Sequence, residues 1–126
     1  MAPCPAAGAP LNVRVCATAP THRLAGMSRS ILQRRLVDVA ERLKRVRAEL
    51  AVAVEQQLFL EEESEEVRLR ALVSETPLAE AEALEARRHA EAMGRHRQAL
   101  ESTLAELLGE QDSLLDRMAT DLSSQP

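Results

Sequence analysis

The side chains of this sequence that could do chemistry are a run of carboxylates and two histidines. The segment EEESEE covers residues 61–66, and His89 and His96 follow later in the chain. Paired carboxylates can act as general acid and base, but only where a concave, partly dry pocket separates their pKa values. The two histidines are seven residues apart, whereas two zinc ligands on a helix need a spacing of three or four. We therefore expect no catalytic, metal or cofactor site and no small-molecule substrate, and we interpret the protein as a non-enzyme.

The cysteines add no second candidate site. Cys4 and Cys16 form no CxxC motif and have no histidine at a ligand interval. Such a pair is weak support for a disulfide or a metal site. We expect two incidental thiols.

The elements that must position these residues are two long helices. Apolar side chains recur at alternating spacings of three and four over residues 28–122, and this repeat keeps one stripe facing a partner helix. Gln57 and Ser64 interrupt the stripe of the first helix with polar side chains. The stripe of the first helix is Leu32, Leu36, Val39, Leu43, Val46, Leu50, Ala53, Gln57, Leu60, Ser64, Val67 and Ala71. The stripe of the second is Ala79, Ala83, Ala86, Ala90, Met93, Arg97, Leu100, Leu104, Leu107, Gln111, Leu114 and Met118.

A short turn separates the two patterns. Pro77 suits the first turn of a helix, Thr76 offers an N-cap oxygen, and proline disfavours a helical conformation at the residue before it. The sequence predicts one helix over about 29–73, a turn over 74–77 and a second helix over about 77–121. A short connection makes the helices antiparallel, so residue numbers across the seam should sum to about 150. The predicted fold class is all-α, a long antiparallel two-helix coiled-coil hairpin.

The ends of the chain differ from this hairpin. Residues 1–27 contain four of the six prolines and no acidic residue, a composition that buries too little apolar area to order itself. No basic segment followed by an unbroken apolar run is present, so a signal peptide is not expected. Met27-Ser28-Arg29-Ser30 is typical of a chain start, with Ser28 or Ser30 as N-cap, so the tail is either disordered or an annotation artefact. Residues 123–126 are expected to be disordered.

Charge and hydropathy narrow the class of partner. No segment approaches the roughly 18 uncharged apolar residues of a membrane span, and the formal net charge is −4. Seven basic residues lie within residues 28–47, but carboxylates alternate with them and no aromatic side chain accompanies them for stacking on bases. We do not expect nucleic-acid binding.

Apolar residues outside the stripe predict a protein partner. Val52, Leu58 and Phe59 lie at b and c heptad positions of the first helix, and Leu108 and Leu115 lie at e positions of the second. A two-helix hairpin buries a single seam, so these residues would be exposed on a monomer. They favour association with a second copy as a homodimer, or with another helical protein. Scattered surface residues, which soluble proteins tolerate, are the alternative.

The carboxylates admit three interpretations. They make the closed end of the hairpin acidic, whereas the open end is basic. They could form a solvated face, pair hairpins head to tail, or form an acidic tip that docks on a nucleic-acid machine such as RNA polymerase. The residues concerned are Glu61, Glu62, Glu63, Glu65, Glu66 and Glu75.

Three segments carry a resemblance to a known group of proteins. They are LVDVAERLKRVRAEL at 36–50, RLRALVSETPLAEAE at 68–82 and RRHAEAMGRHR at 87–97. Together they resemble small coiled-coil proteins of actinobacteria, from Met27 to about Met118. The resemblance implies a helical hairpin and a cytoplasmic location, and it brings no activity and no site residues. The functional expectation is a self-associating cytoplasmic scaffold or adaptor, with the acidic-tip regulator as the alternative.

Overall fold

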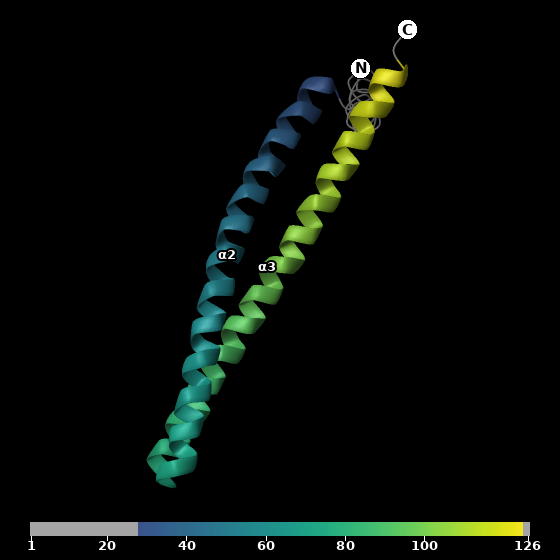
Figure 1. Cartoon of the computed structure of the whole chain (residues 1–126). Helices are drawn as coiled ribbons and strands as arrows, with labels where there is room; N and C mark the ends of the chain where they lie inside the picture. The colour runs from purple at the N-terminus through teal and green to yellow at the C-terminus, as the bar shows by residue number, and fades with distance from the viewer. Residues whose placement is uncertain (1–27, 125–126) are drawn as a thin grey trace, which may run out of the picture. The chain divides into compact units, whose positions relative to one another are not determined.

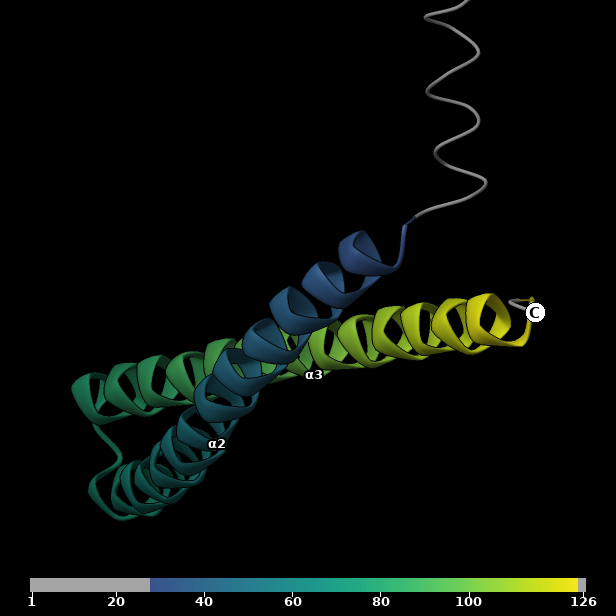
Figure 2. The same cartoon turned by 90° about the horizontal axis from the view of Figure 1, so that it is seen from above.

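The computed structural model describes residues 28–124, which form two helices. Helix α2 spans Arg29–Ser74 and helix α3 spans Pro77–Ser124. They are joined by Glu75 and Thr76 and form an antiparallel hairpin (Figure 1). Each helix is one unbroken ribbon when seen from above (Figure 2). The predicted fold class is therefore confirmed, while the predictions for residues 1–27, including Cys4 and Cys16, lie outside the described residues.

The start of α2 shows how Ser28 fixes the first turn. The backbone N–H of Ile31 donates to the Oγ of Ser28 at 3.4 Å, and the N–H of Leu32 donates to its carbonyl oxygen at 3.1 Å. The bond to Oγ satisfies a donor that the first turn of a helix leaves without a partner, and the bond to the carbonyl is the first hydrogen bond of the helix itself. Ser28 is thus the N-cap.

Glu75 and Thr76 form the turn between the two helices. Glu75 has a φ of 50°, the left-handed conformation that commonly ends a helix, and its N–H donates to the carbonyl of Ala71 at 3.0 Å. The Oγ1 of Thr76 accepts the N–H of Ala79 at 3.2 Å, as an N-cap does. Pro77 is the first residue of α3, where its missing N–H costs nothing.

The end of α3 corrects one expectation. Ser123 and Ser124, predicted to be disordered, are the last residues of the helix. Their hydroxyls donate to the carbonyl oxygens of Ala119 and Asp121, both at 2.9 Å. Serine lowers helix propensity only slightly, and no proline or glycine stops the helix before Ser124. Residues 125 and 126 lie outside the described part of the chain.

The chain divides into two compact units. Of the described residues, one unit contains 28–37 with 114–124, and the other is Asp38–Ser113. In the described part of the first unit, Leu32 and Leu114 are buried, Leu36 and Met118 are half-buried, and Leu115 is exposed. The second unit contains the turn and most of the predicted stripe.

The heptad pattern correctly predicts the seam, which is the line along which the two helices pack. Every a and d position predicted from the sequence is buried or half-buried. Within Asp38–Ser113 the buried side chains are Val39, Leu43, Ala53, Ala71, Ala90, Leu100 and Leu107. Arg97 Nη1 donates to Gln57 Oε1 at 3.3 Å across the seam, in agreement with the expected antiparallel register. In the range 28–124, neither helix has an apolar stretch that could span a membrane.

Candidate protein interface

One side of the hairpin carries a row of shallow depressions between the helices. Their volumes are about 350, 440 and 280 Å³; the first two share Gln56, and the last two share Leu60. We call this row the histidine-side groove. On α2 it is lined by Ala48, Glu49, Val52, Ala53, Glu55, Gln56, Phe59, Leu60, Glu63 and Val67, and on α3 by Glu82, Glu85, Ala86, His89, Met93 and His96.

The apolar part of this groove lies around Phe59. Phe59 is 65% exposed and Val52 is 52% exposed. They are seven residues apart, which places them on the same side of α2. Met93 of α3 and Leu60, both half-buried, line the same depression as Phe59. An aromatic ring, a thioether and one aliphatic side chain therefore line one depression, and Val52 lines the adjacent one.

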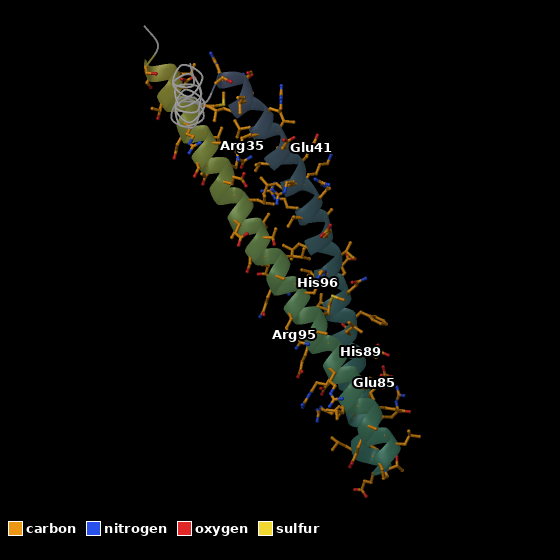
Figure 3. All side chains as sticks on the ribbon, turned by 180° about the vertical axis from the view of Figure 1, so that it is seen from behind. Arg35, Glu41, Glu85, His89, Arg95 and His96 are labelled. Carbon is orange, nitrogen blue, oxygen red and sulfur yellow. The ribbon has the colours of Figure 1, made fainter. Side chains whose placement is uncertain are left out.

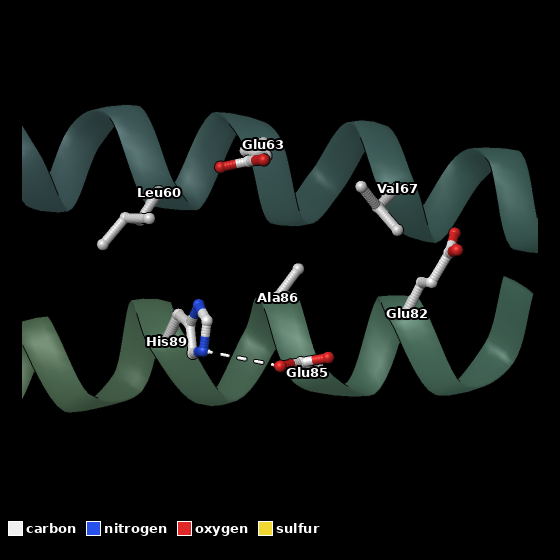
Figure 4. Close-up of a pocket in the computed structure, with 7 residues that line it drawn as sticks. All are labelled: Leu60, Glu63, Val67, Glu82, Glu85, Ala86 and His89. Atoms are coloured by element: carbon white, nitrogen blue, oxygen red, sulfur yellow. Dashed lines mark ion pairs between the residues drawn. The ribbon is translucent and has the colours of Figure 1, made fainter.

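The part of the groove nearer the turn is acidic. Leu60, Val67 and Ala86 form its floor between the helices, and Glu63, Glu82 and Glu85 stand at its edges (Figure 4). His89 Nε2 lies 3.9 Å from Glu85 Oε1. Both side chains are exposed, so this pair contributes little to stability.

His89 and His96 follow one another along α3 (Figure 3). Each lines a different depression of the groove. Among residues 28–124, no three His, Cys, Asp or Glu side chains lie close enough together to hold a metal ion.

A second groove lies between other positions of the same helices and is polar. Gln57, Glu61, Ser64 and Glu65 line it from α2, and Arg87, Ala90, Glu91 and Gly94 line it from α3. We call it the arginine-side groove, because Arg97 lies at its end and bonds both Gln57 and, through Nε at 2.9 Å, Glu101.

Gly94 lies beside the side chain of Gln57 in the arginine-side groove. A Cβ at this position would lie 3.4 Å from the Nε2 of Gln57, which is at the tight end of ordinary contact. The amide of Gln57 also donates to Glu61 Oε1 at 2.9 Å. A hydrogen-bonded network thus occupies the seam at the position where an apolar pair would otherwise pack.

The five residues predicted to bind a partner, three on the first helix and two on the second, do not all line one groove. Val52 and Phe59 line the histidine-side groove, whereas Leu58 lines none of these depressions and is flanked by Gln57 and Glu61 of the arginine-side groove. Leu108 is half-buried, and Leu115 belongs to the other compact unit. The structure therefore brings together Val52, Phe59 and Met93.

The predicted acidic tip is distributed around α2. Its glutamates are all exposed, and consecutive helical residues point about 100° apart. Glu63 lines one groove, and Glu61 and Glu65 line the other. Glu61 precedes Glu75 in the turn by fourteen residues, about 20 Å along the helix. The carboxylates form a belt with a separate charge at the turn.

Two arginines neutralise part of this belt. Arg68 donates to both carboxylate oxygens of Glu65, at 2.6 and 3.0 Å, and Arg70 donates to Glu66 at 3.0 Å. The hydrogen bond from Arg68 lowers the pKa of Glu65 and raises that of Arg68. These pairs hold the carboxylates against their own helix.

Sequence reasoning missed several residues of the surface. Gln56, Met93 and His96 line the apolar depressions, and Leu69, Leu78 and Leu84 are exposed near the turn. The heptad positions contained the signal for the groove, because g and c residues of antiparallel helices flank the same side of a seam.

Comparison with protein-family models, curated proteins and solved structures finds no match.

Proposed function

We propose that this protein is a non-enzymatic cytoplasmic scaffold or adaptor that associates with itself through the histidine-side groove. The observation that supports the proposal is the uncovered apolar cluster of Val52, Phe59 and Met93. Contiguous exposed apolar side chains on a soluble protein are typical of interaction sites. The depressions around them are shallow, whereas small-molecule sites enclose most of their ligand.

The energetics allow such an association. A phenylalanine side chain can bury on the order of 200 Å², so covering the exposed part of Phe59 would contribute about 3 kcal/mol. A symmetric dimer makes this contact twice. The gain competes with an association cost of about 4 to 15 kcal/mol, so neighbouring contacts must supply the remainder.

Sedimentation equilibrium of the full chain tests this proposal. We expect a dimer, and we expect Phe59→Glu to weaken dimerisation by about a hundredfold, which corresponds to about 3 kcal/mol. Leu58→Glu is the matched control, because it places the same charge on the adjacent exposed residue outside the groove. A wild-type chain that stays monomeric, or equal effects of the two variants, would contradict the proposal.

The acidic regulator is the alternative function. It rests on the carboxylates of the belt, and a partner such as RNA polymerase would have to reach them from several sides of α2. The double variant Glu61→Lys with Glu65→Lys separates the two functions, because both residues line the arginine-side groove. A scaffold keeps its dimer in this variant, whereas a docking regulator loses binding to purified polymerase.

A further inference from the structure

The histidine-side face of α2 is complementary to itself. Four exposed residues, Arg45, Val52, Phe59 and Glu66, follow one another at intervals of seven. They share one side of the helix, because each is at the c heptad position. Read in reverse, the order becomes Glu66, Phe59, Val52, Arg45. An antiparallel copy therefore places a carboxylate opposite an arginine at each end, and an aromatic ring opposite a valine twice in the middle.

We propose that two copies pack with their histidine-side grooves face to face, with α2 antiparallel to α2 of the second copy. This inference rests on the proposed self-association and adds its geometry. Phe59 of each copy seats in the depression of the other that is lined by Ala48, Val52 and Ala53, whose small side chains leave about 350 Å³. The two-fold axis makes each contact twice, as an isologous interface requires.

The small exposed residues of α3 lie at the same height along the hairpin as Val52 and Phe59 of α2. His96 lines the depression that contains Val52, and Met93 lines the one that contains Phe59. The midpoint of the apolar pair on α2 is thus level with the stretch between Met93 and His96. Ala92 and Ala99 are exposed and follow Glu85 of the groove at intervals of seven. One axis therefore relates the apolar centres of both helices.

Charge selects the antiparallel direction. Residues 55–91 contain eleven carboxylates and four arginines, whereas residues 42–47 contain four basic residues and no carboxylate. A parallel stack would place one acidic stretch on the other, and like charges across an interface disfavour it. The antiparallel stack places residues 42–47 of each copy opposite the carboxylate belt of the other.

Repulsion between carboxylates at the ends of the two α3 helices offsets this favourable charge interaction only slightly. The interval of seven continues from Ala92 and Ala99 to Glu85 and Glu106, so these carboxylates face each other in the dimer. Both are exposed, and water and salt screen such charges. Glu66 also accepts a hydrogen bond from Arg70 of its own helix at 3.0 Å, but both of these side chains are exposed, and a carboxylate can accept from two arginines. The interaction of Arg45 with Glu66 and the burial of Phe59 therefore decide the arrangement.

Carbodiimide crosslinking of the wild-type full chain tests the geometry directly. Lys44 is the only lysine, and it lies about 33 Å along α2 from Glu66 of its own chain. A Lys44 bond to Glu65 or Glu66 can therefore form only between copies. We expect this crosslink in the dimer band by mass spectrometry. A dimer without it would overturn the antiparallel geometry and leave self-association standing, whereas a monomer in sedimentation would remove both.

A charge exchange provides the second test. Arg45→Glu alone and Glu66→Arg alone should each weaken dimerisation by about tenfold, because both ends of the interface then repel. An equimolar mixture of the two variants should recover wild-type affinity, because the mixed dimer restores an opposite pair at both ends. Arg47→Glu is the control: it makes the same charge change at the heptad position of Glu61, on the other side of α2, and should weaken dimerisation clearly less than Arg45→Glu. A mixture as weak as its components would overturn the geometry.

Discussion

Within Asp38–Ser113, the stretch of the two helices next to the turn buries less than the stretch beyond it. We call residues 55–74 and 77–97 the turn half, and residues 38–54 and 98–113 the leucine half. The leucine half buries Val39, Leu43, Ala53, Leu100 and Leu107, with Leu43 only 2% exposed. The turn half buries Ala71 and Ala90, and its remaining seam positions are half-buried. Four of the five buried residues of the leucine half are leucine or valine, whereas both buried residues of the turn half are alanine.

The two halves also differ in their ion pairs. Among residues 28–124, the ion pairs join Glu65 to Arg68, Glu66 to Arg70, Glu85 to His89, Arg87 to Glu91 and Arg97 to Glu101. All but the last lie in the turn half, and each connects residues three or four apart on one helix. Such pairs stabilise a helix by a few tenths of a kcal/mol each. They do not hold two helices together.

The comparison shows that helix formation and helix pairing are supported by different residues. In the leucine half, apolar burial pairs the helices. In the turn half, local ion pairs and the capped turn support each helix separately, and the seam is occupied by the Gln57–Arg97 network. Phe59 is an apolar side chain of the turn half that lies outside the seam, on the exposed surface.

The largest effect is expected from a charge in the leucine half. Leu43→Asp should lower the free energy of unfolding by about 4 kcal/mol or more, because it removes a buried side chain and buries a carboxylate. Urea unfolding followed by circular dichroism measures the loss. The Phe59→Glu background keeps self-association out of the measurement.

Two companion variants make this test specific. Leu60→Asp, at a half-buried seam position of the turn half, should cost less than Leu43→Asp. Leu69→Asp, at a position that is 51% exposed, should change the free energy of unfolding by about 0.5 kcal/mol or less. Equal losses for Leu43→Asp and Leu60→Asp would remove the distinction between the halves.

A smaller effect is expected from filling the seam of the turn half. Replacing Gln57 and Arg97 together by leucine should raise the free energy of unfolding by about 1 to 2 kcal/mol, because an apolar pair replaces polar groups that lose solvent in the seam. The same urea titration reports the gain. Arg95→Leu with Gln98→Leu, a pair of exposed residues of the same types on α3, is the control and should give no gain. If the double variant were no more stable than the wild type, the Gln57–Arg97 network would pair the two helices as well as an apolar pair does.

The smallest effect concerns Glu65 and pH. Because the hydrogen bond from Arg68 lowers the pKa of Glu65 in the folded chain, the pair contributes stability above the ordinary pKa of glutamate. That contribution is lost as the pH falls through the lowered folded pKa. Both side chains are more than half exposed, so the pH dependence should be slight. Carbon NMR titration should show the pKa of Glu65 returning toward its ordinary value in Arg68→Gln, and an unchanged titration would refute the role of Arg68.

Much of the fold was predictable because its signals are local. The three-four repeat alone identified every seam position, and Thr76 with Pro77 located the turn to within a residue. The surface was harder to predict. Leu58 and Phe59 lie at the neighbouring b and c heptad positions and were therefore grouped, whereas the helical rotation between them places only Phe59 beside Met93. The end of α3 was also missed, because Ser123 and Ser124 form helical hydrogen bonds that their residue types do not require.

The sequence by itself determined the two helices, their antiparallel pairing and their register, because a periodic stripe and a short capped turn leave a single way to bury the apolar side chains. The tertiary structure alone decided which exposed residues act together. Val52, Phe59 and Met93 line one groove because two helices bring their flanks to the same side of one seam. The carboxylates of residues 61–66 separate because the helix turns beneath them. Contacts between helices depend on rotation about the seam, and the order of residues along one chain does not show that rotation directly.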